Sequence, residues 1–299
     1  MIQRSMSWQR EKSNSATKEI KPATYQSLHK TLKTRLNVTV GDEYWRKAQS
    51  YLDFYFKQKQ HDELLFKQPE SSHLGDCPIC CVPLPVHSLK SQHIQICCGK
   101  MICDGCFFAK RTQECPFCRA TPERAQDVWR KRVEANDPDA MLEEGRRHYD
   151  KGEYSSAFEY LTKAAAMGDA EAHHRLAGLY SGGLGVEQDM GKFIHHAEEA
   201  AIGGHPHARF TLGFFEWETG KRERAVKHWI IAATQGEVEA IKWLMKAFKE
   251  GIVIKDDLDS ALRAYQAVVE ETKSPQREAV PENSEGLCRF CACKANCSH

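Results

Sequence analysis

The sequence lacks several features that would place it in a common class of protein. No stretch approaches the roughly eighteen apolar residues of a membrane-spanning helix, and the first residues lack the apolar core of a secretory signal. The 42 basic and 41 acidic residues leave a formal net charge of +1, so no overall field favours nucleic acid or an anionic membrane. Because no phosphate-binding loop or nucleophile elbow is present, a conventional hydrolase is not expected. We expect a soluble intracellular protein of the cytoplasm, the nucleus or both.

Cysteine is the residue that the chain uses most unusually. Nine of its thirteen cysteines fall between positions 77 and 118, and the other four fall between 288 and 297. In an intracellular protein, clustered cysteines at paired spacing indicate metal ligands rather than disulfides.

Three Cys-x-x-Cys pairs lie within 42 residues, and their members are Cys77 and Cys80, Cys103 and Cys106, and Cys115 and Cys118. Each pair can bring two thiolates to one tetrahedral zinc ion at about 2.3 Å. Redox dithiol motifs, in contrast, occur singly. A segment this short has too little core to fold alone, so zinc, worth roughly 10–16 kcal/mol, would supply the folding energy. The sequence predicts a structural Zn²⁺ finger at residues 71–122.

The rest of the chain is internally repetitive. Four alanines open similar segments at separations of 32, 36 and 32 residues, and these are Ala140, Ala172, Ala208 and Ala240. Each is followed by a second segment rich in small residues, and these start at Ala157, Phe193, Ala225 and Ala261. A period of about 34 residues made of two amphipathic helices is the signature of an α/α solenoid. We therefore expect four helical repeats over residues 138–273.

Two of the four repeats have a long turn. The turns run over residues 183–189 and 251–257, and each ends in an aspartate placed to cap the next helix, Asp189 and Asp257. The second repeat resembles the long form of the Sel-1-like repeat family, relatives of the tetratricopeptide repeats, at Gly183, Gly185, Val186, Asp189, Lys192, Ala200, Ala201 and Gly203. Val253 replaces the second turn glycine in the fourth repeat, and the first and third repeats lack the long turn. The resemblance implies a scaffold that binds protein partners.

The predicted fold class is mainly α, with a small zinc-binding domain, an α/α solenoid and disordered termini. Its segments are a disordered basic tail at 1–40, an amphipathic helix at 41–70, the zinc finger at 71–122, a helical connector at 123–137, the repeats at 138–273 and a disordered cysteine-rich tail at 274–299. That last tail holds four thiols and a terminal histidine, which could bind one metal ion or could stay a loose tail.

The order of the cysteine pairs resembles a cross-braced RING finger. The resemblance implies a first zinc site of Cys77, Cys80, Cys103 and Cys106, and a second site that uses Cys98, Cys115 and Cys118. The family has a histidine as the fourth ligand of the second site, and Lys100 stands there instead. A protonated lysine has no lone pair for zinc, so the second site needs another ligand.

Three solutions to this missing ligand are open. Cys97 joins Cys98, His93 or His87 supplies a nitrogen, or the second lobe packs without zinc. Adjacent cysteines on one metal strain the backbone, yet Cys97 is the nearest spare thiolate. We favour Cys97.

The RING resemblance also implies a function, the docking of a ubiquitin-conjugating enzyme by a ubiquitin ligase. Ile79, Pro116 and Arg119 occupy the positions that contact the conjugating enzyme in such ligases. Arginine suits its position because its planar fork can donate to two carbonyl groups at once. The competing interpretation is a non-catalytic adaptor, in which zinc only stabilises a protein-binding lobe. Residues 71–273 together resemble predicted RING and Sel-1-like repeat proteins of diatoms and related algae.

Overall fold

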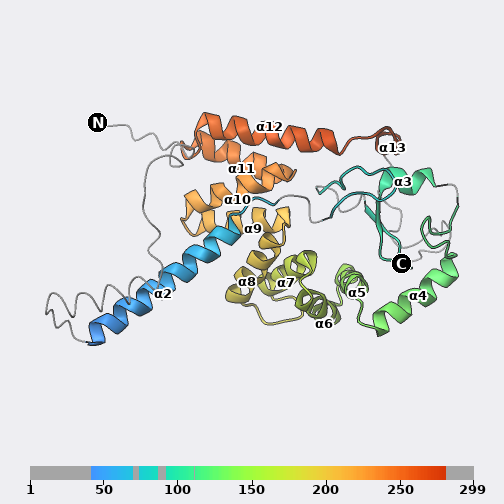
Figure 1. Ribbon diagram of the computed structural model, residues 1–299, viewed down its shortest axis with the longest axis horizontal. Helices are drawn as coiled ribbons and strands as arrows, with labels where there is room; N and C mark the ends of the chain where they lie inside the picture. The colour runs from blue at the N-terminus through green and yellow to red at the C-terminus, as the bar shows by residue number, and fades with distance from the viewer. Residues whose placement is uncertain (1–41, 70–73, 87–91, 111, 281–299) are drawn as a thin grey trace, which may run out of the picture. The chain divides into compact units, whose positions relative to one another are not determined.

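The computed structural model describes residues 42–69, 74–86, 92–110 and 112–280 (Figure 1). The chain divides into two compact units between Glu63 and Leu64, and each unit is described by itself. The predicted basic tail at 1–40 and the cysteines after position 280 lie outside the described residues. Within those residues, no helix is both long and apolar enough to cross a bilayer.

The first unit contains most of one long helix, α2 (Asp42–Leu65). This helix lies where the spacing of aromatic residues predicts an amphipathic helix. Two members of the aromatic stripe that this spacing predicts, Tyr51 and Tyr55, are 69% and 54% exposed.

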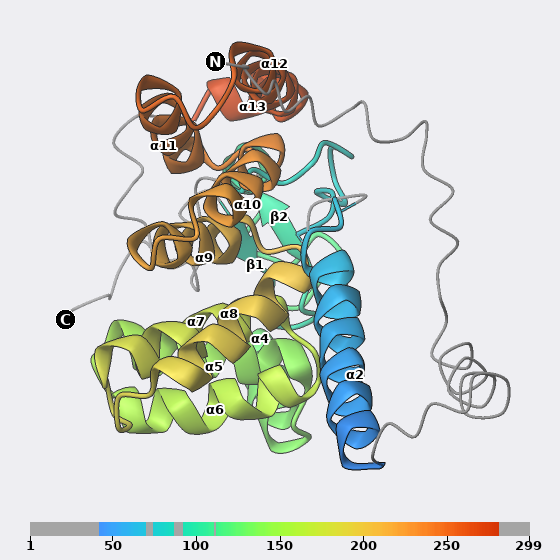
Figure 2. The same ribbon diagram turned by 90° about the vertical axis from the view of Figure 1, so that its left-hand side faces the viewer.

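The repeats form four consecutive helix pairs (Figures 1 and 2). The pairs are α5 (Pro138–Asp150) with α6 (Tyr154–Ala166), α7 (Ala170–Gly182) with α8 (Met190–Ile202), α9 (Pro206–Glu218) with α10 (Arg222–Thr234), and α11 (Val238–Lys249) with α12 (Lys255–Glu271). Each pair packs on the next one, through α6 on α7, α8 on α9, and α10 on α11 and α12, as a solenoid requires. The predicted mainly helical, solenoid-like fold is confirmed.

The first helix of every pair starts at the same kind of cap. A side chain just before the helix accepts a hydrogen bond from a backbone N–H of the first turn, and these caps are Asp137, Asp169, His205 and Glu237. Asp189 caps α8 as predicted, accepting from Gly191 and Lys192. Asp257 does not cap α12: the helix begins at Lys255, and Asp257 lies in its first turn, where its charge still favours the helix dipole.

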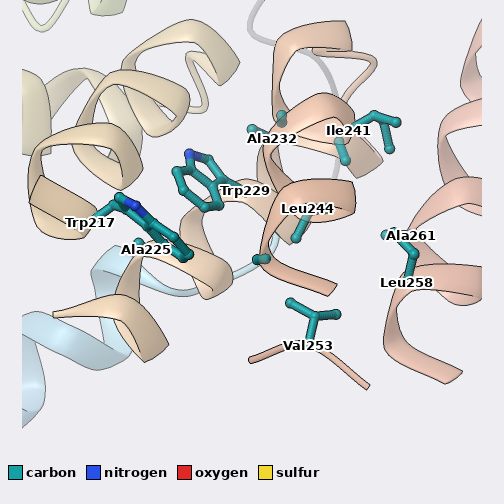
Figure 3. Close-up of a cluster of buried hydrophobic side chains, with 12 residues drawn as sticks. Trp217, Ala225, Trp229, Ala232, Ile241, Leu244, Val253, Leu258 and Ala261 are labelled. Carbon is teal, nitrogen blue, oxygen red and sulfur yellow. The ribbon is translucent and has the colours of Figure 1, made fainter. Parts of the chain in front are cut away.

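Small residues let the helices of the third and fourth pairs approach closely (Figure 3). A Cβ on Gly213 would lie 2.5 Å from Nε1 of Trp229, so only glycine fits beneath that ring. Trp229 is fully buried and contacts the rings of Trp217 and Trp243 at centroid distances of 5.2 and 5.1 Å. Val253, which replaces a turn glycine, is only 4% exposed and extends this core.

The last residue of α2 and the segment after it are built into the repeats. Leu65 is fully buried in a cluster with Phe193 and Leu212. The buried guanidinium of Arg209 donates hydrogen bonds to the backbone carbonyls of Leu65 and Lys67. The second unit therefore fixes the chain just before the predicted finger begins.

The finger consists of a short hairpin and a short helix. Strands β1 (Gln92–Ile94) and β2 (Met101–Cys103) pair antiparallel, and α3 (Asp104–Ala109) follows at once. The connector α4 (Pro122–Glu134) leads from the finger to α5, with Thr121 as its cap.

Part of the predicted C-terminal tail is helical. Residues 274–299 are predicted to be disordered, but Pro275–Glu278 form a further helix, α13, which packs against α3. Sequence pattern could not show this contact because it joins segments more than 160 positions apart.

Candidate metal centre

Three turns of the finger share one backbone geometry. In each, the fifth residue is left-handed and donates its N–H to the carbonyl of the first, and the pairs are Cys81 to Cys77, Gly99 to Gln95, and Arg119 to Cys115, at 2.8, 2.8 and 2.9 Å. Two of these turns have cysteine at their first and fourth positions. The middle turn has Gln95 first and Cys98 fourth, so it offers only one thiol at the positions that the other two turns use.

The first cluster contains the four cysteines that the interleaved pattern implies. The sulfur atoms of Cys77, Cys80, Cys103 and Cys106 all lie within 4.8 Å of one another. Sγ of Cys80 lies 3.8 Å from Sγ of Cys103. Four sulfurs at 2.3 Å from one tetrahedral ion would be about 3.8 Å apart. The donor set and its spacing therefore fit zinc.

The second cluster includes Cys97. Its sulfur lies within 4.8 Å of those of Cys98, Cys115 and Cys118. The Cys98–Cys115 distance of 3.7 Å matches tetrahedral spacing, whereas the Cys97–Cys118 distance is shorter, at 3.3 Å. The middle turn has no cysteine at its first position, and Cys97, at its third position, provides the fourth sulfur of the second cluster instead.

The other two candidates for this ligand are engaged elsewhere or outside the described residues. Nε2 of His93 pairs with the carboxylate of Asp104, and its ring stacks on Phe107 with centroids 3.7 Å apart. His87 falls in the undescribed segment 87–91. Nζ of Lys100 lies 4.5 Å from the ring centroid of Phe117, so this lysine makes a cation–π contact.

The thiols of each cluster differ in acidity. Burial raises the pKa of Cys97, and its hydrogen bonds with Cys118 and Cys115 raise it further. Burial also acts to raise the pKa of Cys77, but backbone hydrogen bonds from Cys103 and Cys80 outweigh it and lower the pKa to about 7. Four closely placed thiols cannot all ionise without a cation, so metal binding at either cluster would release protons.

The three predicted docking residues are accessible. Ile79 is 43% exposed, and Pro116 and Arg119 are exposed as well. Ile79 lies in the first turn, between two cysteines of the first cluster, while Pro116 and Arg119 belong to the turn that provides Cys115 and Cys118. Their role in docking stays a prediction.

Comparisons with known proteins find similarity over part of the chain. No family model matches the chain. A segment is 28% identical over 134 residues to chitin synthase regulatory factor 4 of Schizosaccharomyces pombe, covering 43% of this chain and one fifth (20%) of that protein.

Two solved structures are also similar. One is a Sel1 repeat protein from Oxalobacter formigenes, at 25% identity and a TM-score of 0.43, covering 52% of this chain and 66% of that one. The other is c5321, a protective antigen of uropathogenic Escherichia coli with an SLR fold, at 22% identity and a TM-score of 0.39, covering 58% and 38%. The chain's own helix pairs, α5 to α12, show the repeats.

Proposed function

We propose that this chain is a zinc-binding, RING-like protein whose finger docks a ubiquitin-conjugating enzyme and whose repeats recruit protein partners or substrates. One observation carries the proposal: two tetrads of thiols gather in the interleaved order of a cross-braced finger, and each has a sulfur–sulfur distance, 3.8 Å and 3.7 Å, that fits tetrahedral zinc. Helical repeats of this kind present extended surfaces to other proteins.

Zinc would act as a structural ion at both clusters. The first four thiolates, Cys77, Cys80, Cys103 and Cys106, would hold one ion, and the remaining four, Cys97, Cys98, Cys115 and Cys118, would hold the other. Closed four-sulfur sites leave no open coordination position, so the metal shapes the finger rather than activating a substrate.

The chain's own contribution to ubiquitin transfer is a docking surface. Ile79 and Pro116 offer exposed apolar contacts from two different turns. Arg119 has its guanidinium exposed to solvent and can donate to two carbonyl groups across an interface. Such a contact would hold the conjugating enzyme and its ubiquitin in one arrangement, which favours attack on the thioester.

A non-catalytic adaptor is the second candidate. The short Cys97–Cys118 distance favours it, because a compressed second cluster would displace the turn that bears both Pro116 and Arg119. In that case the finger would only stabilise a protein-binding lobe beside the repeats.

Reconstituted ubiquitin transfer separates the two functions. With a panel of conjugating enzymes, the ligase predicts transfer that is lost in Ile79→Ala and in Arg119→Ala while zinc content stays constant. Arg130→Ala is the matched control, because Arg130 is an exposed arginine of α4 that pairs only locally with Asp127. No transfer with any enzyme of the panel, from fully metallated protein, would favour the adaptor.

We also propose that the protein works inside the cell, in the cytoplasm or nucleus. All nine cysteines of the described residues are free thiols, which suits a reducing compartment. Imaging of a fluorescent fusion tests this, and a secreted product would contradict it.

A further inference from the structure

The helix α13 packs closely against the finger (Figure 1). A Cβ added to Gly105 in α3 would lie 2.5 Å from the carbonyl carbon of Gln276 and 2.6 Å from the backbone nitrogen of Arg277. Gly105 sits in a helix, between two cysteines of the first cluster, and its φ is not left-handed. Its lack of a side chain is therefore needed for the approach of α13 rather than for its own backbone.

Arg277 joins this helix to the first turn of the finger. Its guanidinium donates to the carbonyls of Val82 and Pro83, at 3.0 and 2.7 Å, and to the carbonyl of Thr272, at 2.6 Å. Its Nη2 also lies 3.9 Å from Sγ of Cys80. One side chain thus bridges the end of α12 and a cysteine turn 195 positions away in sequence.

The contact with sulfur has a specific chemical meaning. Four thiolates around one Zn²⁺ carry a net charge of −2, and a charged N–H donor offsets part of it. Loss of a partner that holds a metal ligand in this way typically lowers affinity for the metal by about 10–100-fold. The carbonyl contacts hold the same turn in place.

We propose that the segment after the last repeat helix stabilises the first metal site. In this proposal Arg277 positions Cys80 and slows loss of the metal. This inference rests on the proposed zinc at that cluster. The contact of Arg277 links the finger to the repeats, because a partner that moves α12 or α13 would weaken metal binding in the finger.

The second cluster offers an internal reference. There, Nη1 of Arg132 in α4 donates to the carbonyl of Ile96 at 3.3 Å, and Arg132 pairs with Asp137 at the start of α5. The second cluster is therefore tied to the first repeat, and α13 makes no such contact with it among the described residues. A substitution that displaces α13 should therefore speed release of the metal ion at the first cluster and leave release from the second cluster unchanged.

The test measures zinc release from the full chain. Protein loaded with two zinc ions is mixed with excess chelating dye, and release is followed in the parent, Gly105→Ala, Arg277→Met and the control Arg263→Met. Arg263 is an exposed arginine of α12 that contacts Ser260 only locally. Alkylation of cysteines during release, mapped by mass spectrometry, shows which cluster opens.

We expect one zinc ion to leave roughly tenfold faster in both Gly105→Ala and Arg277→Met, with early alkylation of Cys77 and Cys80. The second ion, and both ions of the control, should leave at the parent rate. The two test variants act independently, so failure of one to fold leaves the other as the test.

Two outcomes would overturn the role of Arg277, and a third would contradict zinc binding itself. Release at the parent rate from both variants would overturn the role of Arg277 while leaving zinc binding intact. Equal acceleration at both clusters would show general destabilisation and would also overturn it. Protein that never holds metal would instead contradict the proposed function itself.

Discussion

The finger and the repeats bury different kinds of side chain. The core of the finger is a group of thiols with few apolar partners, and its members are Cys77, Leu84, Ile102, Cys103 and Cys106. The core around α9–α12 holds tryptophan, leucine and alanine, with fully buried Trp229 at its centre. The repeats can therefore fold on apolar burial, whereas the finger needs a cation to make its buried groups compatible.

Removing the metal should separate the two regions most sharply. Chelation should unfold residues 74–118, because it removes the roughly 10–16 kcal/mol that structural zinc supplies. The helices α5–α12 should persist. Far-ultraviolet circular dichroism and hydrogen exchange by region check this, and loss of protection in the repeats at the same chelator concentration would contradict it.

The second cluster can be broken and rebuilt with two substitutions. Cys97→Ser should reduce bound zinc from two ions to one, because the middle turn then has only one thiol. Adding Lys100→His should restore the second ion, since a neutral imidazole can bind zinc where a protonated lysine cannot.

Native mass spectrometry counts the ions in these variants. Cys81→Ser is the matched control, because the exposed Cys81 belongs to neither cluster. Two ions retained by Cys97→Ser would exclude Cys97 as a ligand.

The apolar region should respond to a cavity without any change in metal. Trp229→Ala should lower the free energy of unfolding of the repeats by about 3–5 kcal/mol. Denaturant titration measures this, and zinc content should stay at the parent value. Met245→Ala, at a position 46% exposed, is the control and should change stability little.

Lowering the pH should reduce the free energy of unfolding of the repeats, by less than the Trp229→Ala substitution does. Burial, together with the charges of Arg209, Arg224 and Lys227, lowers the pKa of His228 to about 3, although the carboxylate of Glu216 lies 3.5 Å from its Nε2. Below pH 6.5 the unfolded chain takes up a proton that the folded chain refuses until about pH 3. The free energy of unfolding should therefore fall with falling pH, by about 1.4 kcal/mol per unit from this residue.

A substitution isolates that contribution. His228→Phe should flatten the dependence of stability on pH between 6 and 4, measured by denaturant titration at each pH. His195→Phe, which changes an exposed histidine of α8, should leave the slope as it is. An unchanged slope in His228→Phe would contradict the account of this buried imidazole.

Local signals in the sequence predicted most of the architecture. Alanines 32 or 36 residues apart predicted the four helix pairs, since a helix that buries one face must repeat apolar and small residues with its period. Cysteine spacing predicted three thiol pairs, because Cys-x-x-Cys is a local geometry, and the resemblance to a RING finger implied how the thiols group into two clusters. The preference for Cys97 followed from its proximity to Cys98, and the structure brings its sulfur into the second cluster.

The contacts that the sequence did not predict are long-range. Three contacts join segments that are distant in the sequence, and no repeating pattern of residues predicts them. They are the contacts of Arg277 with Val82, Gly105 with Gln276 and Arg209 with Leu65. Asp257 shows a different limit of sequence pattern, because its helix begins at Lys255, three residues earlier than a cap at Asp257 would place it.

Counting the metal in the intact protein tests the central claim most directly. Native mass spectrometry of the purified full chain, kept reduced, should show two zinc ions per chain, with both clusters protected from alkylation. A folded chain that carries no metal, or one in which the sulfurs of Cys77 and Cys115 react freely, would contradict the account.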